Sequence, residues 1–315
     1  MDSSAFARIL RSLPELTPSQ REQLLTHVRF DAPAVVALLI ENHPKDCPHC
    51  HEEALRPWGS SHGLPRFRCR ACGKTSNPLT GTPLARLRMR ERWLEYALCL
   101  NDGLTVRRAA AQCQVNKNTA FLWRHRFLKL IADMRPEKEH GIVEADETFF
   151  LKSYKGQRNL PWPARQRGGV SKTKGGGSED QVSVLIVRDR SGKTADYMLK
   201  KLDAAHVTTA LDSILDKDAC LCTDRAGVYL SYAKSKKIRH EPIKASGPRR
   251  RGPFHIQNVN AYDSRLKGWI SRFRGVATKY LGNYLGWHRM LDRHKYRPSS
   301  EQCLFEAVGW GSTVT

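Results

Sequence analysis

Two pairs of cysteines constrain the fold of this 315-residue chain more than any other feature. Cys47-Pro-His-Cys50 and Cys69-Arg-Ala-Cys72 are both CxxC motifs, and 18 residues lie between them. In a reducing compartment this spacing is typical of a metal site rather than of disulfide bonds. Each motif forms a tight knuckle that aims two thiolates at one point, so we expect the four cysteines to bind a structural Zn²⁺. Gly73 follows the second motif, where the knuckle requires a positive φ angle.

The chain is strongly basic, with 53 Lys and Arg residues against 31 Asp and Glu and a net charge of +22. Such an excess favours a polyanionic partner, because phosphate groups release counterions when Lys and Arg bind them. We therefore expect the chain to bind nucleic acid; a ribosome-associated or merely soluble basic protein is the alternative. Hydrophobic residues make up 40% of the sequence, which excludes a wholly disordered chain.

The sequence predicts neither a membrane segment nor an export signal. No stretch approaches the ~18–20 apolar residues that a membrane span needs. Residues 1–15 lack the basic segment, apolar core and cleavage site of a signal peptide. We therefore expect a cytoplasmic protein without a membrane partner.

Residues 104–127 have the layout of a helix-turn-helix. Thr105 caps a short helix, Val115 anchors the turn that follows, and a second helix begins near Asn116. The polar and basic start of the second helix favours contact with a DNA major groove, and an ordinary three-helix packing unit is the alternative. We expect Trp123 and Phe127 to face the core. The predicted DNA contacts are Asn116, Lys117, Asn118, Thr119 and Arg124.

The periodicity of the sequence changes at Gly141. Residues 141–275 predict, in order, three strands, a helix, a strand, a helix, a strand and a long helix. This is the element order of an RNase H-like fold, in which the first and fourth strands are neighbours. In that fold the first strand carries a carboxylate at its centre and the fourth carries one at its end, here Asp146 and Asp224.

A third ligand in this fold comes from the helix after the fifth strand, here the helix that begins near Ile256. Hard oxygen ligands of this kind suit Mg²⁺. Two Mg²⁺ ions about 4 Å apart can activate the attacking oxygen and stabilise the leaving oxygen in phosphodiester chemistry. We therefore expect catalytic Mg²⁺, with two ions per site and Mn²⁺ able to substitute.

The sequence thus predicts an α+β chain of several domains. The segment rich in turn residues ends before a run of helices, and strand periodicity begins only after them. The expected parts are N-terminal helices in residues 1–43, a zinc ribbon in 44–83, a helix-turn-helix DNA-binding domain in 84–138, an RNase H-like α/β catalytic domain with a mixed sheet in 139–297 and a C-terminal tail in 298–315.

Several separate motifs, in order along residues 20–295, carry a more specific signal. They are the zinc ribbon, Thr119–Arg126, Val143–Thr148 (VEADET), Thr223–Ala226 (TDRA), His255–Asn260 (HIQNVN) and Gly275–Trp287. Together they resemble the insertion-sequence transposases of the IS1595 family, the group near the ISXO2 elements. The resemblance implies a DDE-type recombinase that binds the terminal inverted repeats of its element, cuts there, and joins the freed 3′-OH to target DNA.

The resemblance also implies roles for four residues. Asp146 and Asp224 match the first two acids of the catalytic triad. Asn260 stands where the third acid is found, and Lys267 matches a lysine on the same helix. Lys267 is seven residues after Asn260, which is two helical turns, so both lie on one face of the helix. Lys267 would contact the scissile phosphate or the target strand.

Asn260 departs from the acidic pattern of the family. Its side-chain carbonyl is an oxygen ligand, but a neutral one that would hold a metal more weakly than Glu. Some branches of the family it resembles carry Asn at this point. Asp263, one turn along, is a rival ligand, and loss of catalysis is a third interpretation.

Three more residues lie near the predicted site. Glu144 shares a strand face with Asp146, so we expect it to support the metal ligands from behind, whereas Glu147 points to the other face and is structural. His255 precedes the third-ligand helix. It either contacts phosphate or handles a proton at the rim of the site, or it caps and packs the helix.

Two segments are expected to hold the DNA backbone. Residues 152–178 contain seven basic residues and no acid, with Tyr154 and Trp162 as possible stacking groups. The second segment is the basic turn formed by Arg249, Arg250 and Arg251.

We therefore expect a transposase that works on double-stranded DNA, as at least a dimer, at the nucleoid of a bacterial cell. The rival is a DNA-binding regulator without enzymatic activity, including an inactive or domesticated copy of such a transposase. Loss of Asp146 or Asp224 would mark that case, and both are present. A structure-specific nuclease would share the metal site but would need no module that reads sequence.

Overall fold

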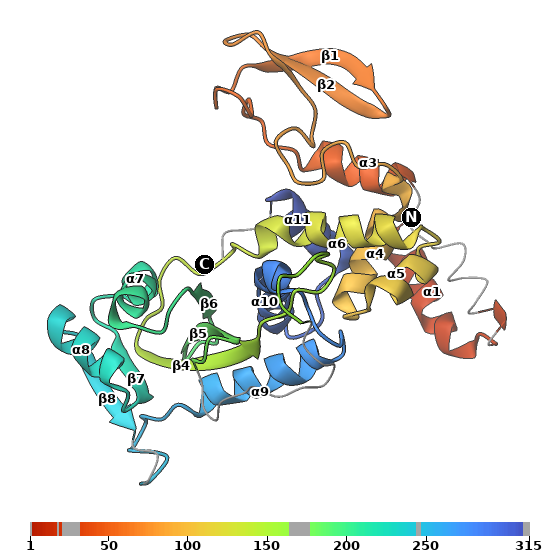
Figure 1. Ribbon diagram of the computed structural model, residues 1–315. Helices are drawn as coiled ribbons and strands as arrows, with labels where there is room; N and C mark the ends of the chain where they lie inside the picture. The colour runs from red at the N-terminus through yellow and green to blue at the C-terminus, as the bar shows by residue number, and fades with distance from the viewer. Residues whose placement is uncertain (1, 18, 21–31, 164–176, 244–246, 311–315) are drawn as a thin grey trace. The chain divides into compact units, whose positions relative to one another are not determined.

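The computed structural model describes the chain except for residues 1, 18, 21–31, 164–176, 244–246 and 311–315 (Figure 1). Its contacts divide the chain into two compact units. The first comprises Met1–Gly81 and Ala85–Leu100, and the second comprises Thr82–Leu84 and Asn101–Thr315. Among the described helices, none combines the length and the apolar character needed to cross a membrane.

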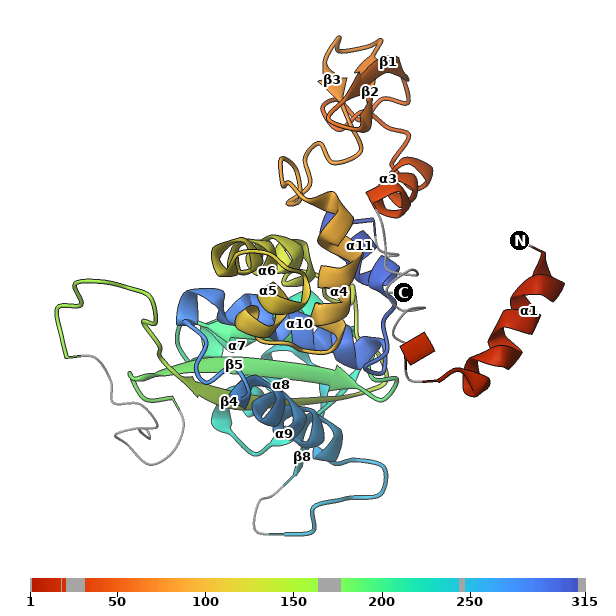
Figure 2. The ribbon, with the colours of Figure 1, turned by 90° about the vertical axis from the view of Figure 1, so that its right-hand side faces the viewer.

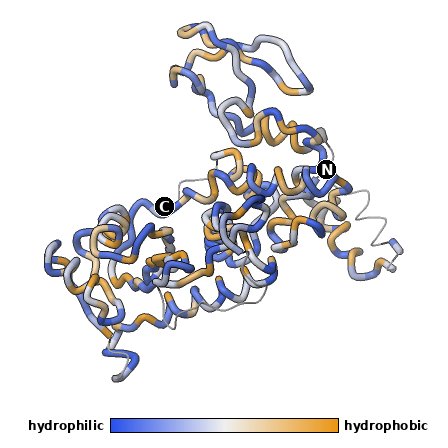
Figure 3. Tube along the Cα trace, in the orientation of Figure 1, coloured by the Kyte–Doolittle hydropathy of each residue, from blue (hydrophilic) through white to orange (hydrophobic). Residues whose placement is uncertain are grey.

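The first unit contains short helices and a small antiparallel sheet of order β1-β2-β3. The turn between β1 and β2 places His62 and Gly63 at φ angles of 51° and 73°, the left-handed values that a tight hairpin favours. Hydrophobic residues predominate in α3 (Figure 3). The elements are α1 (Ser3–Ser12), η1 (Leu13–Glu15), α3 (Ala32–Glu41), β1 (Leu55–Ser61), β2 (Leu64–Cys69), β3 (Thr75–Ser76), η2 (Arg90–Arg92) and α4 (Trp93–Asn101).

The second unit is built on a mixed five-stranded sheet of order β6-β5-β4-β7-β8. The first three strands along the chain are antiparallel neighbours, whereas β7 runs parallel to β4 and β8 runs parallel to β7. The predicted mixed sheet, with its first and fourth strands side by side, is therefore present. The strands are β4 (Ile142–Leu151), β5 (Gln181–Asp189), β6 (Thr194–Leu199), β7 (Cys220–Asp224) and β8 (Arg239–Ile243).

Helices cover both faces of this sheet (Figure 2). On one face, α7 (Ala204–Ile214) and α8 (Gly227–Lys236) share an apolar core with alternate residues of β4 and β5. On the other, α9 (Gln257–Ser271) and α10 (Leu281–Arg293), which follows η3 (Thr278–Tyr280), pack on the opposite residues of β5. Because side chains alternate along a strand, successive residues of β4 face different helices.

The two helices predicted at residues 104–127 are α5 (Val106–Gln112) and α6 (Lys117–Ile131). Thr105 accepts a hydrogen bond from the backbone of Arg108, and the Asn116 side chain accepts one from Asn118, so both predicted caps are present. Trp123 is buried, as expected.

The C-terminal segment differs from the expected tail, because Ser300–Val308 form a helix, α11. A capping box of Ser299 and Gln302 starts this helix, and Gly309, with a φ angle of 82°, ends it. Cys303 and Leu304 are buried, and α11 packs on α6. The capping signal is visible in the sequence, but the apolar stripe is too short to predict a helix by periodicity alone.

Candidate functional site

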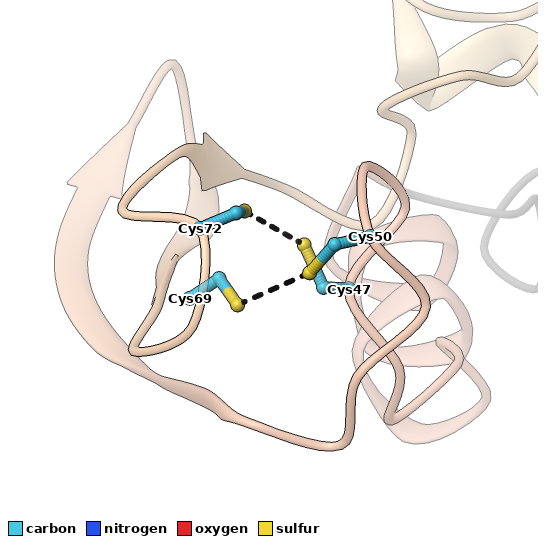
Figure 4. A group of neighbouring side chains, drawn as sticks. All are labelled: Cys47, Cys50, Cys69 and Cys72. Atoms are coloured by element: carbon cyan, nitrogen blue, oxygen red, sulfur yellow. Dashed lines mark hydrogen bonds between the residues drawn. The ribbon is translucent and has the colours of Figure 1, made fainter.

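The four predicted cysteine ligands come together at the ribbon. Their sulfur atoms all lie within 4.8 Å of one another (Figure 4). The Cys47 and Cys72 sulfurs are 3.7 Å apart, and those of Cys50 and Cys69 are 3.6 Å apart. Four Zn–S bonds of about 2.3 Å in a tetrahedron place the sulfurs about 3.8 Å apart. The arrangement therefore fits a four-thiolate zinc site.

Both knuckles use the same backbone turn. The carbonyl of Cys47 accepts from the N–H of His51 at 2.9 Å, and the carbonyl of Cys69 accepts from the N–H of Gly73 at 3.1 Å. Gly73 has a φ angle of 72°, as predicted, and His51 has one of 62°. The residue type did not predict the left-handed conformation of His51.

The two predicted acids lie on neighbouring strands. Asp146 is in the middle of β4, and Asp224 is the last residue of β7. The parallel pairing sets Glu144 opposite Cys222, and each acid stands two residues further along its strand. The carboxylates of Asp146 and Asp224 therefore occupy the same level of the sheet, as the RNase H-like interpretation requires.

Burial and neighbouring acids together raise the pKa of Asp146 to about 6. Burial has the largest effect, and the charges of Asp224 and Asp263 add to it. A backbone hydrogen bond from Glu147, at 2.9 Å, and the charge of Lys267 oppose the shift. A site in which carboxylates repel one another is one that a divalent cation would stabilise.

The helix α9 contributes a polar face to the same site. Asp263 forms an ion pair with Lys267, with 2.8 Å between Oδ2 and Nζ. The other oxygen of Asp263 is buried and has no hydrogen-bond partner among the described residues. Asn260 is exposed one turn nearer the start of the helix. Both proposed third ligands thus lie on this face, and Asp263 is the one whose charge acts on Asp146.

Glu144 and His255 meet behind this site. Glu144 is fully buried and forms an ion pair with Arg190, with 2.6 Å between Oε1 and Nη1. His255 Nε2 lies 2.8 Å from the same guanidinium nitrogen. Burial and then the charge of Arg190 lower the pKa of His255, which favours its neutral form as a hydrogen-bond acceptor. His255 thus contacts Arg190, and its Nδ1 accepts a hydrogen bond from the backbone N–H of Gln257 at 3.2 Å, at the start of α9.

Glu147 points away from this cluster, as predicted. Its carboxylate accepts a hydrogen bond from the hydroxyl of Tyr229 on α8 at 2.6 Å. Burial raises the pKa of Glu147. Its contact with α8 is on the face of the sheet opposite α9.

The predicted DNA contacts at the start of α6 are at the surface, with Asn116, Lys117 and Asn118 exposed and Thr119 half-buried. The three arginines of the basic turn are also exposed: Arg249, Arg250 and Arg251. In the other basic segment, Tyr154 and Trp162 are 39% and 47% exposed, with ring centroids 5.2 Å apart. Residues 164–176 of that segment lie outside the described residues.

Arg124 is a correction to the predicted DNA contacts, because its side chain is 0% exposed. Its guanidinium lies 4.5 Å from the ring centre of Trp287 and donates to the carbonyl of Leu104 at 2.7 Å. The helical spacing already indicates burial of Arg124, because it lies next to Trp123 and three residues before Phe127, on the buried stripe of α6.

Replacing Arg124 by Ala is expected to lower the free energy of unfolding by about 2–3 kcal/mol, through a cavity and a lost hydrogen bond. DNA affinity should change less than about twofold. Lys117→Ala, at the exposed start of the same helix, should weaken DNA binding and leave the free energy of unfolding nearly unchanged. Thermal unfolding and DNA-binding titrations measure both. Weaker DNA binding by Arg124→Ala at unchanged stability would restore Arg124 as a DNA contact.

Comparison with known proteins places this site in a family. Residues 139–287 match the ISXO2-like transposase domain. Residues 139–287 are called the transposase domain below, after the family model that they match. The IS1595-family resemblance of the motifs is thereby confirmed. The transposase domain contains Asp146, Asp224, Asn260 and Lys267, whereas the cysteine cluster lies outside it.

One relative by sequence also comes from a transposable element. The chain is 26% identical to an uncharacterized protein in transposable element ISH50 of Halobacterium salinarum, over 82% of this chain and 88% of that protein. Among solved structures it is similar to the simian T-cell lymphotropic virus intasome in complex with PP2A regulatory subunit B56 gamma (13% identity, 49% of each chain, TM-score 0.30). It is also similar to the Mos1 strand transfer complex (14% identity, 68% of this chain and 77% of that one, TM-score 0.24). Scores this low carry no conclusion about this chain.

Proposed function

We propose that this transposase binds the terminal inverted repeats of an insertion sequence, cuts a DNA strand there with Mg²⁺, and joins the freed 3′-OH to target DNA. The observation that carries the proposal is the placement of Asp146 and Asp224 at one level of two neighbouring parallel strands. The polar face of α9 lies within electrostatic reach of Asp146. Water is the first nucleophile, and the 3′-OH is the second.

We propose that Asp146, Asp224 and Asn260 hold the catalytic metal, as a DDE-type site with Asn in third place. Mg²⁺ bound there would activate the attacking oxygen and stabilise the leaving oxygen. The two carboxylates supply the negative charge that the metal needs, and Asn260 adds a neutral oxygen. Lys267, now paired with Asp263, can turn to the scissile phosphate or target strand and offset its charge.

We propose that the modules outside the transposase domain recognise the ends of the element. A zinc ribbon in residues 44–83 and a helix-turn-helix in 84–138 would bind the inverted repeats, with Asn116–Thr119 in the major groove. Arg249–Arg251 and residues 152–178 would hold phosphates. Two paired ends require two active sites, so we propose at least a dimer on DNA, at the nucleoid in the cytoplasm.

Asn260 favours a second function, that of a catalytically inactive DNA-binding regulator derived from such a transposase. A neutral ligand holds a divalent cation less tightly than a carboxylate does. Cleavage of labelled element ends by the purified protein, with Mg²⁺ and with EDTA, distinguishes the two. Cleavage that occurs with Mg²⁺ and not with EDTA supports the transposase. Binding of the ends without metal-dependent cleavage supports the regulator.

Asn260→Ala is expected to reduce cleavage at least about tenfold, because residues that merely support metal ligands already contribute 10–100-fold. Asp263→Asn, which keeps the size of the side chain one turn away, should have the smaller effect. Single-turnover cleavage and Mn²⁺ affinity measure both variants. The reverse order of effects would give the third ligand position to Asp263.

A further inference from the structure

The helix that carries Asn260 and Lys267 has no capping side chain at its N-cap position. Ile256 occupies the N-cap position of α9, and its side chain makes no capping hydrogen bond. The first N–H groups of any helix lack partners within the helix and must be satisfied from outside it. At the start of α9 the N–H of Gln257 donates to Nδ1 of His255 at 3.2 Å, and the next two N–H groups find their partner on the central strand of the sheet.

That partner is Glu144 of β4. Its Oε2 atom accepts hydrogen bonds from the backbone N–H groups of Asn258, at 2.8 Å, and Val259, at 2.9 Å. The carboxylate also lies at the positive end of the α9 dipole. Glu144 stands two residues before Asp146, on the same face of β4. The strand that provides the first acid therefore also holds the start of the helix that provides the third ligand.

Arg190 holds the second oxygen of Glu144. Beyond the 2.6 Å ion pair with Glu144, its Nη2 donates to the carbonyl of Pro253 at 2.9 Å, and its Nη1 contacts His255. A buried carboxylate without a partner would be strongly unfavourable. The guanidinium pairs with the Glu144 side chain and connects the end of β5 with the segment that leads into α9.

The apolar contacts of α9 hold the helix on the sheet but do not fix its exact position. Val259 and Tyr262 are fully buried and pack with Val182, Val184 and Ile186 of β5. Such contacts keep the helix on the sheet but are non-directional, so they resist a small slide or rotation only weakly. Two hydrogen bonds to one carboxylate oxygen fix both the height and the rotation of the helix start.

We propose that Glu144, held by Arg190, is a positioning residue that sets the ligand-bearing face of α9 relative to Asp146 before any metal binds. The inference rests on the proposed function, because that function makes α9 a source of metal ligands. Both oxygens of Glu144 are engaged by Arg190, Asn258 and Val259, so it acts through α9. Small errors in such placement have large effects on rate and affinity.

The test uses the full-length, zinc-loaded protein without DNA, titrated with Mn²⁺ and followed by the electron paramagnetic resonance of the free ion. Glu144→Ala should weaken Mn²⁺ binding about tenfold or more. Glu144→Gln should weaken it less, because its amide oxygen can still accept from Asn258 and Val259. The matched control is Glu306→Gln, which loses ion pairs with Arg293 (2.6 Å) and His294 (2.7 Å). It should lower the melting temperature and leave Mn²⁺ affinity within twofold.

Hydrogen exchange supplies a second readout. The amides of Asn258 and Val259 should exchange faster in Glu144→Ala than in Glu306→Gln. If Asp146→Ala weakens Mn²⁺ binding and Glu144→Ala does not, the inference is overturned. If Asp146→Ala itself leaves Mn²⁺ binding unchanged, the proposed metal site fails instead. Should Glu144→Ala fail to fold, Glu144→Gln, which preserves size, is compared with the control in both readouts.

Discussion

Replacing Asp146 by Asn is expected to slow metal-dependent cleavage of element ends by roughly a thousandfold, since several kcal/mol of charge stabilisation are lost. Asn has nearly the same size as Asp, so the substitution removes charge without leaving a cavity. Asp146 accepts one backbone hydrogen bond, from Glu147, and lies among the charges of Asp224 and Asp263. The measurement is the single-turnover rate of strand cleavage at saturating protein.

A matched control separates chemistry from binding and folding. Asp203 caps α7 by accepting from the N–H of His206, and Asn is an equally good cap, so Asp203→Asn should leave cleavage unchanged. DNA affinity of Asp146→Asn should stay within about twofold of the wild type, because the proposed phosphate contacts come from Lys and Arg. A cleavage rate within tenfold of the wild type would contradict the catalytic role of Asp146.

The raised pKa of Asp146 predicts how pH acts on this site. Without metal its carboxyl group has a pKa of about 6. Below that pH the carboxyl group is mostly protonated, and a metal ion must displace the proton in order to bind. Apparent Mn²⁺ affinity should therefore fall as the pH decreases from about 7 to 5. Titrations at several pH values check this, and Asp146→Asn should weaken both the binding and its dependence on pH.

Removal of zinc is expected to unfold the ribbon while the transposase domain stays folded. Binding of a structural Zn²⁺ contributes about 10–16 kcal/mol, which in a small metal domain is largely folding free energy. The β1-β2-β3 sheet has few buried side chains of its own. The transposase domain instead has apolar cores on both faces of its sheet. Chelation or Cys69→Ser should therefore abolish protection of ribbon amides and weaken binding to element ends.

The zinc content of the protein provides the control. Wild-type protein should contain about one Zn²⁺ per chain, and Cys69→Ser should contain far less. Cys303→Ala removes a buried thiol of α11 outside the cluster and should retain the metal. A wild-type content well below one Zn²⁺ per chain would refute the four-cysteine site.

Local sequence patterns predicted much of the candidate site. Two CxxC motifs predict four converging sulfurs because the knuckle is a property of a few consecutive residues. The order of strands and helices likewise predicted that Asp146 and Asp224 would be neighbours, because few topologies suit that order. The cap residues Thr105 and Asn116 were predictable for the same local reason.

Other features depend on contacts between distant residues, and these were wrong or missed. The sequence predicts Arg124 as a DNA contact, but α6 turns its side chain against Trp287. The expected tail forms α11, whose few apolar residues are buried only because α6 lies beside them. Asp263 lies more than a hundred residues after Asp146 in the sequence. Its charge acts on Asp146 only because α9 packs on the sheet.

The sequence by itself determined the residue types of the proposed metal sites, the order of the elements and the pairing of the two central acids. These follow from spacing, periodicity and topology, which act over short segments or allow few alternatives. Only the tertiary structure decided which face of α9 meets Asp146, and that Glu144 caps this helix with Arg190 behind it. Those contacts join residues that are distant along the chain. The burial and the partners of a side chain depend on which distant elements pack against it, and local sequence patterns do not specify these.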